Sequence, residues 1–231
     1  MQERYKKNIG FLTEPLLYDL LSKTIAVLGV GGQGGYIVEY LARLGVKKII
    51  IFDPDTFEES NLNRQRFCNM SSLGSSKAES SAKQALEINP TIQIEYYSEA
   101  CGEQHWSILQ TCNFIFACAD NGINGEENRR VLRRCLLNHI PIIDVATTNF
   151  GYQIHCNCND VQAWDGMSEA YCRKKWTKET RPNLSTPAYL CSMGSSLAVN
   201  YMVEYFRQPL ASFNKHVEYH INRNQLIVLP L

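Results

Sequence analysis

The fold is decided by residues 24–35, TIAVLGVGGQGG, where an apolar run leads directly into five closely spaced glycines. Residues 24–30 are mostly apolar and predict a buried strand, and the pattern of residues 35–44 predicts a helix. A glycine-rich turn between a strand and a helix lets the backbone approach a phosphate, which the N–H groups at the helix start can bind. The segment therefore predicts a nucleotide-binding α/β fold.

The alternation of strand and helix patterns continues to residue 145. The predicted strands are 48–52, 92–97, 114–118 and 141–145, and the predicted helices are 75–87, 105–109 and 126–137. Such repetition predicts a Rossmann-like, mainly parallel sheet with helices on both faces. Further along, a long apolar helix is predicted at 189–206, and strands at 151–158, 216–221 and 225–229 predict an antiparallel C-terminal extension.

We expect one domain over residues 1–231. Within it, residues 1–22 form an N-terminal helical segment, and the polar, irregular residues 159–188 form a crossover loop that covers the substrate. The composition, 45% hydrophobic and 20% charged, is that of a globular protein with one sizeable core.

Charge and cysteine content limit the possible partners and compartments. Lys plus Arg and Asp plus Glu number 23 each, so no overall positive field favours nucleic acid or an anionic membrane. No stretch has the length of a membrane helix, and the N-terminal MQERYKKNIGF lacks the apolar run of a signal peptide. Nine scattered cysteines do not suggest a disulfide framework. We expect a cytoplasmic protein with reduced thiols that binds neither membrane nor nucleic acid.

An acidic residue follows the second predicted strand, where a ribose is commonly bound. Asp53 lies 19 residues beyond Gly34 (53 minus 34), and a carboxylate there accepts hydrogen bonds from a ribose hydroxyl. Alone, the glycines could form a structural turn and Asp53 could cap a helix. Together they predict a nucleotide, and at this point NAD and ATP both remain open.

Charged residues beyond Asp53 favour ATP, whose roughly four negative charges need cations and usually a metal. Arg64 in SNLNRQR (residues 60–66) and Lys77 in GSSK (residues 74–77) can contact a triphosphate and stabilise a leaving pyrophosphate. Asp120 follows the predicted strand 114–118 at the carboxyl edge of the sheet and is our candidate Mg²⁺ ligand. Each residue alone could be a solvated charge or a helix cap, but their joint spacing favours ATP with Mg²⁺.

Five ordered motifs over about residues 23–145 resemble the adenylation domain of the ThiF/MoeB/HesA superfamily, which is related to ubiquitin-activating enzymes. The motifs are a GxGGxG loop, Asp-x-Asp, Ser-Asn-Leu-x-Arg-Gln, a lysine that opens a helix, and Ala-Asp-Asn. The matching nucleotide-site residues are Gly29, Gly31, Gly32, Gly34, Asp53, Asp55, Asn61, Arg64, Gln65, Lys77, Asp120 and Asn121.

The resemblance implies ATP-dependent adenylation of a carboxylate, giving acyl-AMP and pyrophosphate. The carboxylate is commonly the C-terminus of a ubiquitin-like or sulfur-carrier protein or of a peptide, and the enzyme is usually a homodimer. By the resemblance, Asp53 binds the ribose, Asp120 holds Mg²⁺, and the phosphates are bound by Asn61, Arg64 and Lys77. Arg64, Lys77 and Asp120 are the implied catalytic residues.

Two features depart from the family pattern. The N-terminal Arg-Tyr-x-Arg segment, whose second arginine reaches the phosphates in the partner subunit, is here RYKK (residues 4–7). Lys7 would replace that arginine unless Arg4 or Arg66 does, or the segment is only a solvated basic terminus. The paired Cys-x-x-Cys motifs of zinc-binding members are absent. The remaining cysteines offer only an irregular set, and we expect no zinc; that set is Cys156, Cys158, Cys172 and Cys191.

Cys172 is the candidate for a second covalent step. It lies in the predicted crossover loop beside three cations, residues 173–175, and nearby cations lower the pKa of a thiol. In some members of the superfamily a cysteine in such a loop forms a thioester or a persulfide, whereas others stop at the adenylate. Cys172 could equally be an incidental reduced cysteine.

Three alternatives compete with this interpretation. An NAD-dependent oxidoreductase would share the glycine loop and Asp53, although no Tyr-x-x-x-Lys pair stands out. A non-catalytic partner subunit of an activating-enzyme heterodimer would share the fold, but Arg64, Lys77 and Asp120 argue against it. A related branch dehydrates a modified adenosine in tRNA, and the neutral net charge argues weakly against a nucleic acid substrate.

Overall fold

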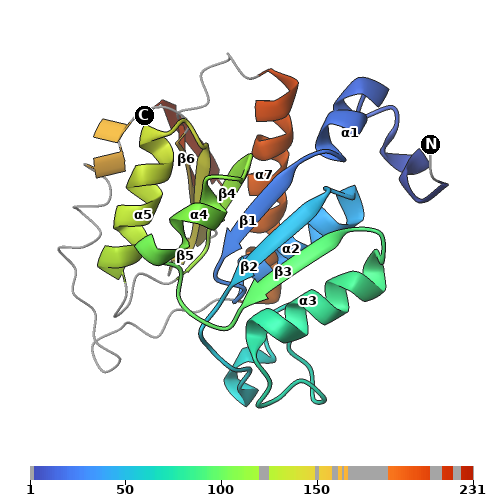
Figure 1. Ribbon diagram of the computed structural model, residues 1–231, viewed down its shortest axis with the longest axis vertical. Coiled ribbons are helices and arrows are strands. Elements are labelled where there is room, and N and C mark those ends of the chain that lie inside the picture. Colours follow the sequence, from blue (N-terminus) through green and yellow to red (C-terminus); the bar gives the residue numbers. More distant parts are fainter. Residues whose placement is uncertain are drawn as a thin grey trace.

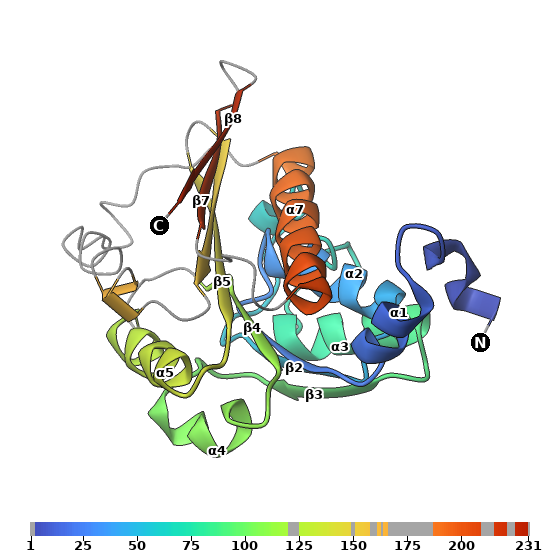
Figure 2. The same ribbon diagram turned by 90° about the horizontal axis from the view of Figure 1, so that it is seen from above.

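The described part of the chain forms one eight-stranded sheet with helices on both faces (Figures 1 and 2). The computed structural model describes residues 3–119, 125–148, 151–157, 161–162, 164–165, 187–208, 215–220 and 225–230. The strand order is β3-β2-β1-β4-β5-β6-β7-β8. The predicted Rossmann-like class is therefore confirmed.

Strands β1 to β5 are parallel, and β5 to β8 are antiparallel. The strands are β1 (Thr24–Leu28), β2 (Lys48–Phe52), β3 (Gln93–Tyr97), β4 (Phe114–Ala117), β5 (Ile142–Thr148), β6 (Gly151–Asn157), β7 (Lys215–His220) and β8 (Gln225–Pro230). The helices are η1 (Glu3–Asn8), α1 (Glu14–Leu20), α2 (Gly34–Leu44), η2 (Glu59–Asn61), α3 (Lys77–Ile88), η3 (Glu103–His105), α4 (Trp106–Leu109), α5 (Gly125–Leu137) and α7 (Ala188–Arg207).

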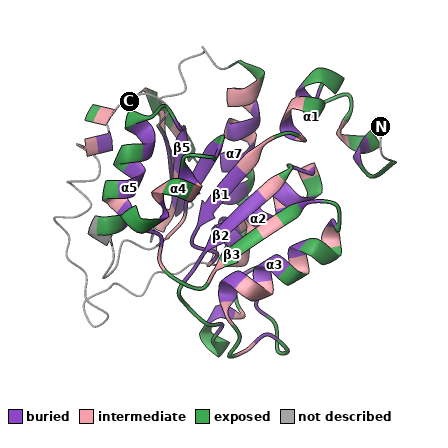
Figure 3. Cartoon of the chain, viewed as in Figure 1, coloured by how far each residue is buried: buried purple, intermediate pink, exposed green. Residues whose placement is uncertain are grey.

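Alternate residues of the central strands supply two separate cores, one on each face of the sheet. Ile25 and Val27 of β1 join the core beneath α1, α2, α3 and α7, whereas Ala26 and Leu28 join the core beneath α4 and α5. Figure 3 shows that β1 and β2 are largely buried and that the edge strand β3 is more exposed. The near-continuous apolar pattern of β1 and β2 arises because helices cover both of their faces.

Element boundaries differ from the predicted ones by a few residues. The largest extension is in β5, which runs to Thr148 rather than to residue 145, because its last residues pair with β6 across the antiparallel ladder. The link 222–224 and most of the predicted crossover loop 159–188 lie outside the described residues. Within those residues, no helix is long and apolar enough to cross a membrane.

Candidate nucleotide-binding site

The glycine loop between β1 and α2 is closely packed at two of its glycines. Gly29 has a φ of +88°, and a Cβ built there would lie 2.7 Å from backbone atoms of Ala119. A Cβ at Gly34 would lie 1.8 Å from the carbonyl oxygen of Gly29. Glycine is therefore required at both positions, because the loop folds back on itself and against the segment after β4.

Asp53 holds this loop from the end of β2. Its buried carboxylate accepts hydrogen bonds from the backbone N–H of Val30 at 2.7 Å and of Asp55 at 2.9 Å. Burial raises the pKa of Asp53, while Lys77 and the two backbone donors act in the opposite direction. Asp53 thus has a structural role in the loop besides its predicted role toward a ribose.

The segment that contains Arg64 lies over the glycine loop. A Cβ at Gly32 would be 3.8 Å from Cγ of Arg64, and one at Gly31 would be 3.7 Å from Nε2 of Gln65. The Arg64 guanidinium is exposed and donates to the carbonyl oxygen of Ser60 at 2.8 Å and to Oδ1 of Asn63 at 2.9 Å. The sequence motif and the glycine loop therefore form one site, with an exposed cation above it.

Lys77 and Asn61 are buried at the edge of this site. Lys77 Nζ lies 3.0 Å from Oδ2 of Asp55, and the lysine side chain is 8% exposed whereas that of Asp55 is 66% exposed. The Asn61 side chain accepts from the backbone N–H of Glu58 at 3.1 Å and so shapes its own segment. Lys77 can turn from the exposed Asp55 to a phosphate without losing a buried partner.

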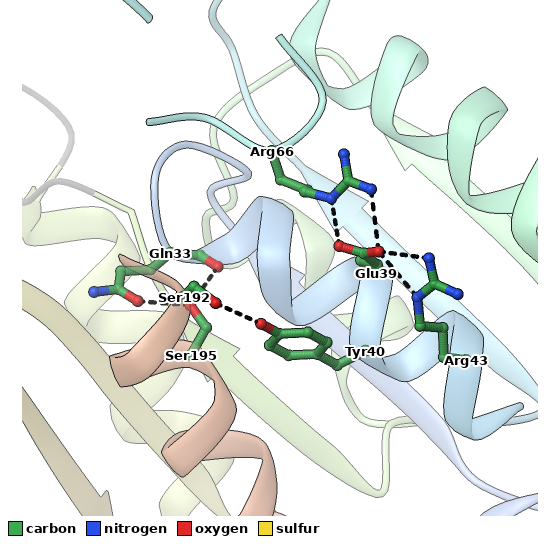
Figure 4. Close-up of polar contacts among 7 residues, drawn as sticks. All are labelled: Gln33, Glu39, Tyr40, Arg43, Arg66, Ser192 and Ser195. Atoms are coloured by element: carbon green, nitrogen blue, oxygen red, sulfur yellow. Dashed lines mark hydrogen bonds and ion pairs between the residues drawn. The ribbon is translucent and has the colours of Figure 1, made fainter. Parts of the chain in front are cut away.

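Helix α7 packs against the glycine loop from the other side. The sequence predicted this helix but not its contact with the loop. Ser195 Oγ lies 2.6 Å from Oε1 of Gln33, which directly precedes α2, and Figure 4 shows this contact beside the pair formed by Tyr40 and Ser192 at 2.8 Å. Cys191 Sγ would be 3.0 Å from a Cβ at Gly32, and burial raises its pKa to about 11. Because α7 is distant in sequence, no local pattern identifies these contacts.

Several groups around the loop are suited to a phosphate. Helix α2 starts without a side-chain cap, so its first N–H groups can bind an anion at the positive end of the helix dipole. Within the described part of the chain, Nε2 of Gln33 and Oε1 of Gln65 are buried and have no hydrogen-bond partner, although buried polar atoms are normally hydrogen-bonded. Gln65 lies against Gly31, where a bound nucleotide would offer its amide a partner, so these residues fit ATP.

Three predicted site residues cannot be placed. Asp120, Asn121 and Cys172 lie outside the described residues. Among the residues that are described, no group of three or more His, Cys, Asp or Glu side chains could hold a metal ion. Cys156 lies in β6 with its side chain fully buried in the core, and Cys158 lies outside the described residues.

The basic N-terminus lies near the C-terminal end of α2, whereas the glycine loop lies at the N-terminal end of that helix. Tyr5 is buried there: its hydroxyl accepts from Nδ2 of Asn89 at 2.9 Å and lies against Gly45, which follows the last residue of α2. The 11 residues of α2 separate this point from the loop by about 16 Å. Arg4 donates to Asn89, so this arginine is engaged far from the site of its own chain.

A polar network covers one face of the antiparallel strands, and the sequence did not predict it either. Nδ1 of His155 lies 2.7 Å from Nδ1 of His216, whose Nε2 lies 2.8 Å from Glu218; His220 also contacts Glu218 at 2.9 Å. Asp144 of β5 is in register with His155 and with Ala117 of β4. Along β7 the residues of this network alternate with Val217 and Tyr219. Such alternation predicts a strand but does not indicate which polar side chains contact one another.

The fold and the glycine loop define a nucleotide-binding α/β protein of the Rossmann-like type. The family model for the ThiF family matches residues 5–229, and the chain therefore belongs to the ThiF family. This membership confirms the resemblance carried by the five motifs.

The chain is similar to several curated proteins. It is 29% identical over 147 residues to a tRNA threonylcarbamoyladenosine dehydratase of Bacillus subtilis, an alignment that covers 62% of this chain and 56% of that protein. It is 42% identical over 76 residues to ubiquitin-like modifier-activating enzyme 5 of Caenorhabditis elegans, covering 33% of this chain and 18% of that protein. The chain thus spans about half, or less, of the length of these relatives.

Solved structures share the fold. The structure of E. coli MccB with ATP has a TM-score of 0.75 and 19% sequence identity, with 100% of this chain and 71% of that chain covered. PaaA has a TM-score of 0.75 and 16% identity, with 94% and 75% covered. At this identity the likeness establishes the common architecture.

Proposed function

We propose that the protein uses ATP and Mg²⁺ to adenylate a carboxylate, releasing pyrophosphate and leaving an acyl-AMP. The observation that carries the proposal is the placement of Arg64 and Gln65 against Gly32 and Gly31, together with Lys77, which pairs with Asp55 two residues after Asp53. Nucleophilic attack by a carboxylate oxygen on the α-phosphorus breaks the bond to the β,γ-diphosphate, and both electrons of that bond leave with the pyrophosphate. Cations beside the leaving group stabilise this developing charge.

Each residue has a stated part in this reaction. Arg64 and Lys77 bind the β- and γ-phosphates, α2 N–H groups bind the α-phosphate region, and Asp53 binds the ribose with lone pairs that its two backbone donors leave free. We propose Asp120 as the Mg²⁺ ligand and Cys172 as a candidate acceptor of the acyl group. ThiF-family membership favours ATP over NAD.

The proposed substrate is a flexible C-terminal carboxylate of a small ubiquitin-like or sulfur-carrier protein, or of a peptide. Support comes from the likeness to ubiquitin-like modifier-activating enzyme 5 and to MccB, one structure of which contains MccA. A second candidate is the carboxylate of a threonylcarbamoyl group in tRNA. It is favoured by likeness to dehydratases of B. subtilis and Saccharomyces cerevisiae, the latter 31% identical over 125 residues, and disfavoured by the zero net charge.

Exchange of labelled pyrophosphate into ATP tests the proposal. We would compare peptides, carriers ending in Gly-Gly, and tRNA as the source of the carboxylate. Lys77→Gln should abolish the exchange, whereas Lys83→Gln on the same helix should not, because the Lys83 side chain is 69% exposed and pairs with Glu79 on the same face of the helix. ATP binding without exchange for any carboxylate would exclude adenylation of these classes, and binding of NADH without ATP would exclude an ATP-dependent reaction.

We also propose a homodimer in which Lys7 acts on the nucleotide of the partner subunit. The distance of the N-terminal segment from its own glycine loop supports action in trans, as does the engagement of Arg4 with Asn89 and of Arg66 with Glu39. Mixing Lys7→Ala with Arg64→Ala protein should restore exchange, because a mixed dimer contains one site with neither change. No recovery, in a sample that sedimentation shows to contain mixed dimers, would contradict action in trans.

A further inference from the structure

Glu39 is a buried carboxylate inside the helix that begins at the glycine loop. It lies on α2, and its side chain is 8% exposed. Arg43 donates from Nε at 2.9 Å and from Nη2 at 2.7 Å, and Arg66 donates from Nε and, at 3.1 Å, from Nη2. Figure 4 shows Glu39 between the two guanidinium groups. A buried carboxylate is stable only when it is paired in this way.

The two arginines differ in what they connect. Arg43 is four residues from Glu39 on the same helix, and its side chain is 56% exposed, so this pair is local to α2. Arg66 is 27 residues away and belongs to the segment that carries Arg64. The Arg66–Glu39 pair therefore ties that segment to α2, while the Arg43–Glu39 pair ties α2 only to itself.

Close packing beside the ion pair gives this tie a defined geometry. A Cβ at Gly35 would be 3.4 Å from Cβ of Arg66 and 3.6 Å from its backbone nitrogen, so the segment rests directly on the first turn of α2. The hydrogen bonds of Arg64 to Ser60 and Asn63 both stay within its own segment. The position of Arg64 relative to the loop consequently depends on how the segment is held.

We propose that Glu39 and Arg66 are positioning residues that hold the Arg64 side chain against Gly32, so that its guanidinium can reach the phosphates of ATP. This inference rests on the proposed function. It assigns Arg66 to the support of Arg64 rather than to direct contact with phosphate. Because an ionic group displaced by about 1 Å loses much of its effect on a bound or reacting phosphate, loss of the tie weakens the contribution of Arg64 even though Arg64 itself is present.

Calorimetric titration of Mg·ATP into the full-length protein tests the inference. Arg66→Gln and Glu39→Gln should each weaken ATP binding about tenfold, similar to Arg64→Ala, because each loses one charge-assisted phosphate contact. Arg43→Gln is the matched control: it also removes one guanidinium from Glu39, but it should change the affinity less than twofold. Thermal unfolding of all variants is measured in parallel to confirm that they fold.

The decisive variant is Arg64→Ala combined with Arg66→Gln. If Arg66 acts through Arg64, the double variant binds ATP within twofold of Arg64→Ala alone, and Arg66→Lys recovers part of the affinity. Multiplied losses in the double variant, or equal losses for Arg43→Gln and Arg66→Gln, would overturn the positioning role while leaving the proposed function intact. Wild-type protein that does not bind ATP would instead overturn the proposed function and this inference with it.

Discussion

The two halves of the sheet are built on different principles. In the parallel half, β1 to β4, every residue of β1, β2 and β4 is buried except the first residue of β1 and of β2. In the antiparallel half, β5 to β8, Val217 is the one buried residue of β7, and β8 is largely exposed. The parallel half is an apolar support for the glycine loop, whereas the antiparallel half presents titratable side chains on a sheet face.

The largest expected effect tests the parallel half through the loop that it supports. Gly34→Ala should destabilise the fold by more than about 3 kcal/mol and abolish ATP binding, because its Cβ would lie 1.8 Å from a backbone oxygen that no side-chain movement can relieve. Gly31→Ala is the control in the same loop, since its nearest atom is 3.7 Å away, and it should change stability by less than about 1 kcal/mol. Urea unfolding and ATP titration measure both. Normal ATP binding by Gly34→Ala would refute the loop geometry.

A second prediction concerns the pH dependence that the antiparallel half confers. Burial, and then the neighbouring His216, lower the pKa of His155 to about 3, while Glu218 acts in the opposite direction. The unfolded chain, with an ordinary histidine pKa near 6.5, therefore binds more protons between pH 6.5 and 3, so stability falls as the pH falls through this range. Between pH 7 and pH 4 we expect a loss of about 3 kcal/mol attributable to His155. His155→Phe should remove that part of the slope in unfolding experiments from pH 7 to 4, and an unchanged slope would argue against the buried neutral imidazole.

The sequence predicted the strands of both halves, but it did not predict the contacts that α7 and the segment 60–66 make around the glycine loop. The parallel strands and the glycine loop were predictable because uninterrupted apolar runs, glycine spacing and Asp53 are local patterns. The apposition of Arg64 to Gly32 was predictable only through the order of the motifs. The roles of Ser195, Cys191 and Glu39 were not, because they arise when α7 and the segment 60–66 pack onto α2 from distant parts of the chain.

Asp144 provides a smaller test with the opposite sign. Burial raises its pKa to about 7, whereas an unfolded aspartate titrates near 3.8. The folded protein therefore binds more protons in this range, and the stability that Asp144 contributes below pH 3.8 is lost as the pH rises through 7. Asp144→Asn should stabilise the protein by about 2 kcal/mol at pH 8, where the carboxylate is charged, and by much less at pH 4, where it is protonated in the folded protein. The partly exposed position of Asp144 limits the size of the effect. Equal effects at the two pH values in thermal unfolding would show that this carboxyl is not shifted.

The smallest expected effect comes from the same substitution, Val→Thr, made in each half of the sheet. Val228 in β8 is 51% exposed and Val27 in β1 is fully buried, so Val→Thr places a hydroxyl in water in one case and in an apolar core in the other. Val228→Thr should change the unfolding free energy by less than about 0.5 kcal/mol. Val27→Thr should lower it by about 2 kcal/mol, because the new hydroxyl is buried in an apolar core without a hydrogen bond. A large loss for Val228→Thr would mean that a further surface covers β8, and the exposed apolar residues Leu226 and Leu229 beside it would then belong to an interface rather than to a free edge.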